Sequence, residues 1–173
     1  METWDAVRSR RDVREFADVP VTDEVLRRIL EAGRRTPSSR NWQPWTFVVV
    51  TERDQLRRLS GVWRGAAHVA RSAATIALVA DDPTPTDRDT LHYDLGQATM
   101  QMMLAAADLG VASGHSIVEN QDLATEVLGL GPKQMCCYLI PIGMPQQRLR
   151  PIEEPDRRPY PDVVRFVEAR GGG

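Results

Sequence analysis

The sequence predicts a single α+β domain, in which α-helices surround a β-sheet. Its 173 residues are enough for one sizeable core and too few for two ordinary domains. Hydrophobic residues make up 42% of the chain and charged residues 27%, as is typical of a folded soluble protein. Apolar runs at residues 46–50, 74–80 and 135–142 predict strands, and a helical pattern over 88–109 predicts one long helix.

The N-terminal part predicts two helices and an extended segment before the first strand. Residues 3–9 suit a short helix, and residues 12–16 read as extended. Thr22 is a suitable N-cap for a second helix, because Asp23 and Glu24 follow it in the first turn. After the strand at 46–50, Thr51 and Asp54 predict a capping box for a third helix.

The second half is organised around the long helix. Its repeated small residues predict close packing on more than one side, and hence a central, buried position. Residues 111–118 predict a short strand, and Asn120 is expected to cap a helix that ends near Leu128. From about residue 146 to 173 the chain is rich in proline and charge. We expect an arm that wraps a partner subunit, with a disordered end as the alternative.

Composition argues against several classes of function. The net charge of −2 provides no basic field for nucleic acid or anionic membranes. Cys136 and Cys137 are adjacent and lie in an apolar run, which favours core thiols over a disulfide or a metal site. The N-terminus lacks a signal-peptide pattern, and no apolar stretch is long enough to span a membrane, so we expect a cytoplasmic location.

The segment at residues 37–45, Pro-Ser-Ser-Arg-Asn-Trp-Gln-Pro-Trp, carries the strongest functional signal. Its two prolines interrupt any helix, and the loop leads directly into a predicted buried strand, where α/β proteins often bind ligands. Hydroxyl, amide and indole groups together can recognise a flat, polar-edged aromatic ring. The alternative is a packed loop in which Trp42 and Trp45 are structural.

The segment at residues 10–16, Arg-Arg-Asp-Val-Arg-Glu-Phe, is the second signal. If it is extended, Arg10, Asp12 and Arg14 share one face. Two guanidinium groups on one face can hold a phosphate through charge-assisted hydrogen bonds. A solvated surface of mixed charge is the alternative.

Five segments in chain order resemble the nitroreductase-like family of FMN-dependent oxidoreductases, of which this chain would be a short member. Residues 10–16 resemble the family's phosphate segment and residues 37–45 its flavin loop. Asp94-Leu95-Gly96-Gln97-Ala98 begins a stretch similar to the central dimer helix. Residues 139–145 and 157–160 resemble its penultimate strand and its C-terminal basic clamp.

The resemblance implies an α/β/α sandwich with a mixed or antiparallel central sheet, a long helix at a dimer interface and a C-terminal arm. It implies a homodimer that binds FMN, with NADH or NADPH as reductant and no metal. The backbone N–H of Glu119 would lie near flavin N5. The implied cofactor-binding residues are Arg10, Arg11, Asp12, Arg14, Pro37, Ser38, Ser39, Asn41, Gln43, Val118, Glu119, Arg157 and Arg158.

The implied activity is hydride transfer from NAD(P)H through the flavin to an electron-poor acceptor such as a nitroaromatic or a quinone. No catalytic side chain is required, because the cofactor carries the chemistry. Asp12 and Asn120 depart from the family's usual serine and glycine, and a short region between residues 61 and 89 predicts an open pocket. The alternatives are a same-fold enzyme that uses a deazaflavin or acts as a dehydrogenase or dehalogenase, and a non-catalytic flavin-binding or regulatory module.

The three histidines are not spaced as a metal site or a catalytic triad. We expect His68 and His92 to be core or surface residues. His115 lies close to the predicted flavin segment and could line the pocket.

Overall fold

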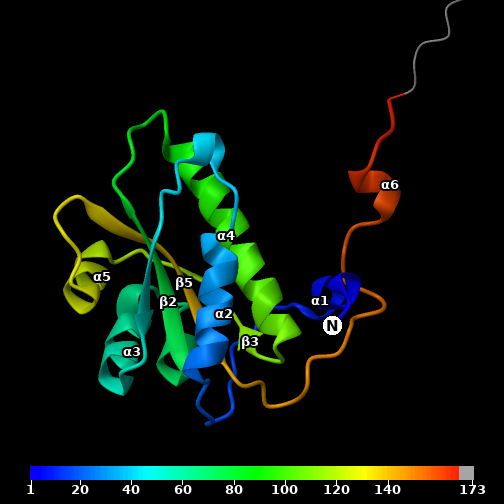
Figure 1. Ribbon diagram of the computed structural model, residues 1–173, viewed down its shortest axis with the longest axis horizontal. Coiled ribbons are helices and arrows are strands. Elements are labelled where there is room, and N and C mark those ends of the chain that lie inside the picture. The colour runs from blue at the N-terminus through cyan, green and yellow to red at the C-terminus, as the bar shows by residue number, and fades with distance from the viewer. Residues whose placement is uncertain (168–173) are drawn as a thin grey trace, which may run out of the picture.

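A five-stranded antiparallel sheet forms the centre of the computed structural model, which describes residues 1–167 (Figure 1). Its strands follow the order β1-β2-β5-β3, and β4 also pairs with β5. The only parallel contact among the described residues is an isolated bridge between Asp12 and Ser113. The strands are β1 (Thr46–Val50), β2 (Ala74–Asp81), β3 (Ala112–Ser113), β4 (Ser116–Ile117) and β5 (Gln134–Gly143).

Helices cover both faces of this sheet, which confirms the predicted α/β/α sandwich (Figure 1). Helices α2 and α4 pack on one face, and α3 and α5 pack on the other with the 3-10 turns η2 and η3. The helical elements are α1 (Thr3–Ser9), α2 (Asp23–Arg34), η1 (Ser39–Asn41), α3 (Arg53–Leu59), η2 (Ser60–Val62), η3 (Ala67–Arg71), α4 (Arg88–Asp108), α5 (Gln121–Leu128) and α6 (Tyr160–Val163).

Strand β2 joins the two halves of the core. It is buried along its whole length except at Asp81. Because side chains alternate along a strand, Ile76 and Leu78 pack toward α2 and α4, while Ala77 and Val79 pack toward α3 and α5. This two-sided burial explains why the strand reads as a nearly continuous apolar run.

Most predicted boundaries are confirmed. Strand β1 has the predicted limits, and α4 ends one residue earlier than expected. The side chains of Thr22 and Asn120 accept hydrogen bonds at the starts of α2 and α5, from Val25 N–H at 3.4 Å and Leu123 N–H at 3.0 Å.

Two local predictions need correction. Helix α3 begins one residue later than the predicted capping box requires, so Glu52 occupies the N-cap and its side chain makes no capping bond. The short strand expected within residues 111–118 is divided into β3 and β4, which both pair with β5.

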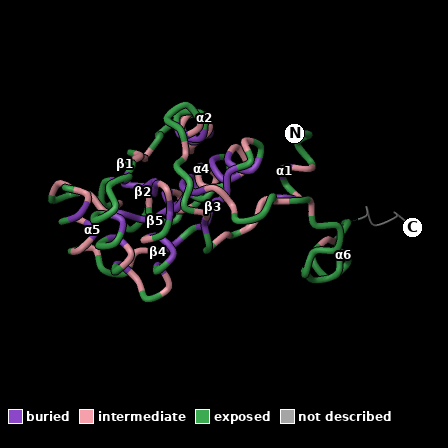
Figure 2. The backbone as a smooth tube through the Cα atoms, turned by 90° about the horizontal axis from the view of Figure 1, so that it is seen from below, coloured by how far each residue is buried: buried purple, intermediate pink, exposed green. Residues whose placement is uncertain are grey.

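After β5 the chain leaves the layered body as an exposed arm (Figures 1 and 2). The start of the arm is fixed to α1, where Ile152 N–H donates to the Arg8 carbonyl at 3.1 Å and Arg8 pairs with Glu153 at 2.6 Å. Tyr160, Val163 and Phe166 are exposed beyond this attachment. The predicted arm covers residues 146–173, of which 168–173 lie outside the described residues. Within residues 1–167, no helix is both long and apolar enough to cross a membrane.

Candidate functional site

The 37–45 loop has an unusual backbone. Arg40, Asn41 and Gln43 adopt positive φ angles of 54°, 56° and 52°. Left-handed backbone at residues other than glycine costs energy, and it persists only where surrounding contacts enforce it. Specific contacts therefore maintain the conformation of the loop, and they hold its polar side chains in one arrangement.

Polar contacts close the loop on itself. The Ser38 hydroxyl accepts a hydrogen bond from Gln43 N–H at 2.8 Å, and the Gln43 side-chain amide donates to Asn41 Oδ1 at 3.1 Å. The structure thus brings together three of the residues predicted to contact a flavin. Trp45 stacks on Phe47, with ring centroids 6.1 Å apart, whereas Trp42 is 44% exposed. Of the two tryptophans, Trp45 is therefore the one that has a structural role in packing the loop.

The loop is also attached to α4 through Asp94, a residue that the sequence prediction did not single out as functional. Asp94 is fully buried, and its carboxyl group accepts hydrogen bonds from Ser39 N–H at 3.0 Å and Ser39 Oγ at 3.4 Å. A signal was present in the sequence, because Asp94 lies on the apolar face of α4 with Leu91 and Leu95. A carboxyl group at such a position needs polar partners.

A pocket lies beside the loop, on the side of the segment that follows β2. It is lined by Trp42, Trp45, Asp81, Asp82 and Thr84, among others. Part of the lining comes from residues 61–89, the short region for which the sequence predicts an open pocket.

The basic segment, residues 10–16, is extended as predicted and lies against the far end of the sheet. Val13 N–H donates to the Ser113 carbonyl at 2.9 Å, and Ala17 N–H donates to the Met144 carbonyl at 2.8 Å. Gly114 allows this approach, because a Cβ atom there would lie 2.6 Å from the Val13 carbonyl oxygen.

Charges in the basic segment are partly paired. The Asp12 carboxylate lies 2.8 Å from His115 Nδ1 and 3.9 Å from a guanidinium nitrogen of Arg10. Arg14 is exposed and forms no hydrogen bond or ion pair with any of residues 1–167. Burial and the nearby Arg14 charge hold the pKa of His68 below its usual value. His115 therefore faces Asp12, and Arg14 remains available for an anion.

Two predicted site residues are committed to other partners. The Arg11 guanidinium donates to the carbonyls of Ser9 and Arg150, so it fastens the C-terminal arm. The Glu119 N–H donates to the Val62 carbonyl at 3.0 Å, and Asn120 N–H shares that acceptor at 2.9 Å. The Glu119 N–H is therefore engaged by Val62 in the structure, and its role beside a flavin stays a prediction. Val118 packs with the core on the α3 and α5 side.

The C-terminal basic pair does not join the basic segment within one chain. Arg157 and Arg158 are exposed on the arm beyond its attachment to α1 (Figure 1), and Arg157 donates to the neighbouring Asp156 carbonyl at 2.5 Å. A clamp formed by these arginines and Arg10 or Arg14 is absent from the described part of a single chain.

The 37–45 loop and the basic segment lie toward opposite ends of α4 (Figure 1). The loop contacts Asp94, whereas the N-terminus of the chain pairs with Asp108, and the basic segment bridges Ser113 beyond the helix end. At 1.5 Å per residue, Asp94 and Asp108 are about 21 Å apart along the helix. One chain therefore carries two separated half-sites, one suited to a ring and one suited to an anion.

Known proteins resemble this chain in sequence and in fold. The model of the nitroreductase family matches residues 7–67, which include the basic segment and the 37–45 loop. The "Putative NADH dehydrogenase/NAD(P)H nitroreductase" of Archaeoglobus fulgidus is 29% identical over 161 residues, which cover 90% of this chain and 92% of the relative. The FMN reductase [NAD(P)H] of Bacillus subtilis is 26% identical, over 89% of this chain and 60% of its own length.

The fold has close counterparts among solved structures. A "putative nitroreductase in complex with fmn" from Desulfovibrio desulfuricans superposes with a TM-score of 0.79 at 27% identity, covering 98% of this chain and 99% of that one. Taken with the sequence relatives, this likeness shows that the chain resembles the nitroreductase family in sequence and in fold.

Proposed function

We propose that this protein is an FMN-dependent NAD(P)H oxidoreductase that reduces electron-poor acceptors such as nitroaromatics or quinones. The observation that carries the proposal is the pair of half-sites at the two ends of α4, each with the chemistry of one part of a flavin mononucleotide. Its relatives include an FMN reductase [NAD(P)H] and a protein solved with FMN.

A homodimer would unite the two half-sites, and we propose this assembly for the active protein. Tyr93 and Met100 are 69% and 41% exposed on α4, and Gly96 lies between them on the same face. A Cβ atom at Gly96 would meet nothing within 4 Å in the single chain. Since glycine costs a helix interior about 1 kcal/mol relative to alanine, close approach of a second α4 would explain its presence.

The residues present fit the proposed cofactor. Arg14 carries a guanidinium that has no partner among residues 1–167, and Arg10 lies on the same face of this extended segment, so both would hold the phosphate. His115 and Arg10 lie beside Asp12, which offsets the repulsion that its carboxylate would exert on a phosphate. Ser38, Ser39 and Asn41 of the second copy would contact the ring from the ordered loop.

Flavin, when bound, supplies hydride acceptance and donation, and the protein's part is binding, orientation and exposure of one ring face. The left-handed backbone of the 37–45 loop presents its polar groups in one arrangement before any ligand arrives, and this reduces the ordering cost of binding. No acid or base among the described side chains is assigned to the reaction.

The decisive experiment begins with the absorbance spectrum of the purified protein and the mass of the chromophore released from it. We expect the spectrum of an oxidised flavin and the mass of FMN, followed by oxidation of NADH or NADPH once a nitroaromatic or p-benzoquinone is added. A colourless protein that stays colourless after incubation with FMN would overturn the proposal. A released deazaflavin, or tight FMN binding without turnover, would favour the corresponding alternative.

A further inference from the structure

The 37–45 loop and the residue just before it are attached to α4 at two points, and the stronger attachment is at Asp94. Ser39 N–H and Ser39 Oγ donate to the Asp94 carboxyl group at 3.0 and 3.4 Å, and the Gln97 side-chain amide donates to it at 3.3 Å. The side chain is completely buried. A buried carboxyl group is costly unless donors surround it, so the position is explained by its partners in the loop.

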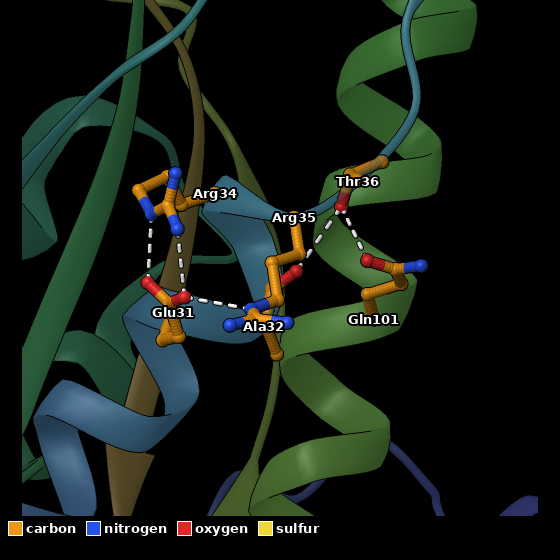
Figure 3. A network of polar contacts seen from close by, with 6 residues as sticks. All are labelled: Glu31, Ala32, Arg34, Arg35, Thr36 and Gln101. Carbon is orange, nitrogen blue, oxygen red and sulfur yellow. Dashed lines mark hydrogen bonds and ion pairs between the residues drawn. The ribbon is translucent and has the colours of Figure 1, made fainter.

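The second attachment lies two helical turns further along α4. The Thr36 hydroxyl, which is buried, donates to Gln101 Oε1 at 2.7 Å and approaches the Ala32 carbonyl at 3.4 Å (Figure 3). Asp94 and Gln101 are seven residues apart, so they share one face of α4. The residues just before and inside the loop are therefore fastened to a polar stripe on this helix.

The end of α2 is fixed independently of this stripe. Glu31 accepts hydrogen bonds from Arg34 at 2.7 Å and from Arg35 at 2.7 Å, on the side of the helix turned away from Gln101 (Figure 3). The chain thus enters the loop from a defined position. Among residues 1–167, the hydrogen bonds that tie the segment around the strained turn at Arg40 and Asn41 to the rest of the protein are those to Asp94.

We propose that Asp94 is a positioning residue for the 37–45 loop, with Gln101 as a second anchor. By holding Ser39, Asp94 maintains the left-handed turn and fixes the loop to the helix that carries the exposed Tyr93–Met100 face. The contacts that order the loop are made by the chain's own residues. The consequence for FMN binding rests on the function proposed above.

Limited proteolysis tests the order of the loop in protein freed of any cofactor. Trypsin can cut after Arg40, which is exposed within the strained turn. We expect Asp94→Ala to accelerate this cleavage at least about tenfold, while cleavage after Arg58 in α3 stays at the wild-type rate. Asp94→Asn keeps a carbonyl acceptor for Ser39 N–H and should cleave nearly as slowly as wild type. Asp108→Ala, which removes an exposed carboxyl group at the other end of α4, is the matched control.

Affinity for FMN provides the second measurement, by titration of the same variants at fixed salt. We expect about tenfold weaker binding for Asp94→Ala, recovery in Asp94→Asn and no change in Asp108→Ala. If Asp94→Ala does not fold, Thr36→Val replaces it, with a few-fold faster cleavage after Arg40 expected. Unchanged cleavage after Arg40 in a folded variant, or equal acceleration at Arg58, would overturn the positioning role. Failure of wild-type protein to bind FMN would instead overturn the proposed function and leave the proteolysis result standing.

Discussion

Neighbouring residues of the same type have different roles in this protein. Arg11 and Arg14 are three positions apart in the basic segment. Arg11 donates to two backbone carbonyls and fastens the arm, whereas Arg14 is exposed and unpaired within the described residues. The sequence predicts that both arginines bind a phosphate, and only their contacts in the structure distinguish their roles.

This difference predicts the behaviour of two alanine variants. Arg14→Ala should weaken FMN binding by one to two decades, because a charge-assisted hydrogen bond contributes about 1.5–3 kcal/mol and each decade in affinity corresponds to about 1.4 kcal/mol. Arg11→Ala should change the affinity by less than about threefold. Fluorescence titration at matched salt measures both, and equal affinities for Arg14→Ala and wild type would show that Arg14 is a surface residue only.

The adjacent cysteines predict a pH dependence of stability. Burial raises the pKa of Cys136 to about 12 and that of Cys137 to about 11, from an ordinary value near 9.0. Above about pH 9 the unfolded chain therefore releases thiol protons that the folded chain retains, and stability falls as pH rises.

Cys137→Ala isolates one of these thiols. Between pH 8 and 10.5 the variant should lose less stability than wild type, by up to about 2 kcal/mol, since one pKa unit corresponds to about 1.4 kcal/mol. Urea unfolding at the two pH values gives the comparison. Parallel losses in both proteins would mean that the Cys137 thiol titrates equally in the folded and unfolded chains.

At the scale of elements, local signals predicted structure well where one feature dominates. The apolar run at 46–50 and the long pattern of α4 gave correct positions, as did the caps at Thr22 and Asn120. Other contacts depend on residues that are distant in the sequence. Glu119 N–H bonds to Val62, 57 positions earlier, and no local pattern reports such a pairing.

The docking of the basic segment on β3 predicts a severe effect of Gly114→Ala. The added Cβ would lie 2.6 Å from the Val13 carbonyl oxygen. The oxygen belongs to the backbone and the Cβ has no rotatable bond to move it away, so the segment must move away from Ser113. We expect a loss of about 1–3 kcal/mol of stability, as for other overpacked sites, and at least about tenfold weaker FMN binding. Gly131→Ala is the control, because its nearest neighbour, Gln134 Oε1, would be at 3.6 Å. Thermal unfolding and FMN titration should separate the two variants, and equal behaviour would exclude the steric argument.

At the scale of the whole molecule, the separation of the half-sites is the feature that the order of motifs along the chain could not reveal. The basic segment and the 37–45 loop are close in sequence, yet the loop contacts α4 at Asp94, whereas the basic segment bridges Ser113 beyond the opposite end of that helix. The exposed apolar residues of α4 and of the C-terminal arm lie outside both cores. Both facts favour a site completed by a second copy, with the arm reaching across to it.

Gly96 offers a test of this assembly that leaves the single chain intact. An arginine at position 96 meets no atom within 4 Å of its Cβ in one chain, and it favours helix over glycine, so the subunit should fold. At an interface between two closely packed α4 helices, the arginine would add bulk and would bring two like charges together. We therefore expect Gly96→Arg to sediment as a monomer with a native circular dichroism spectrum and to lose FMN binding. Gly131→Arg adds the same side chain in the turn before β5 and should remain dimeric and flavin-bound. A Gly96→Arg monomer that binds FMN as tightly as wild type would show that one chain forms the whole site, contrary to the separation of the two half-sites along α4.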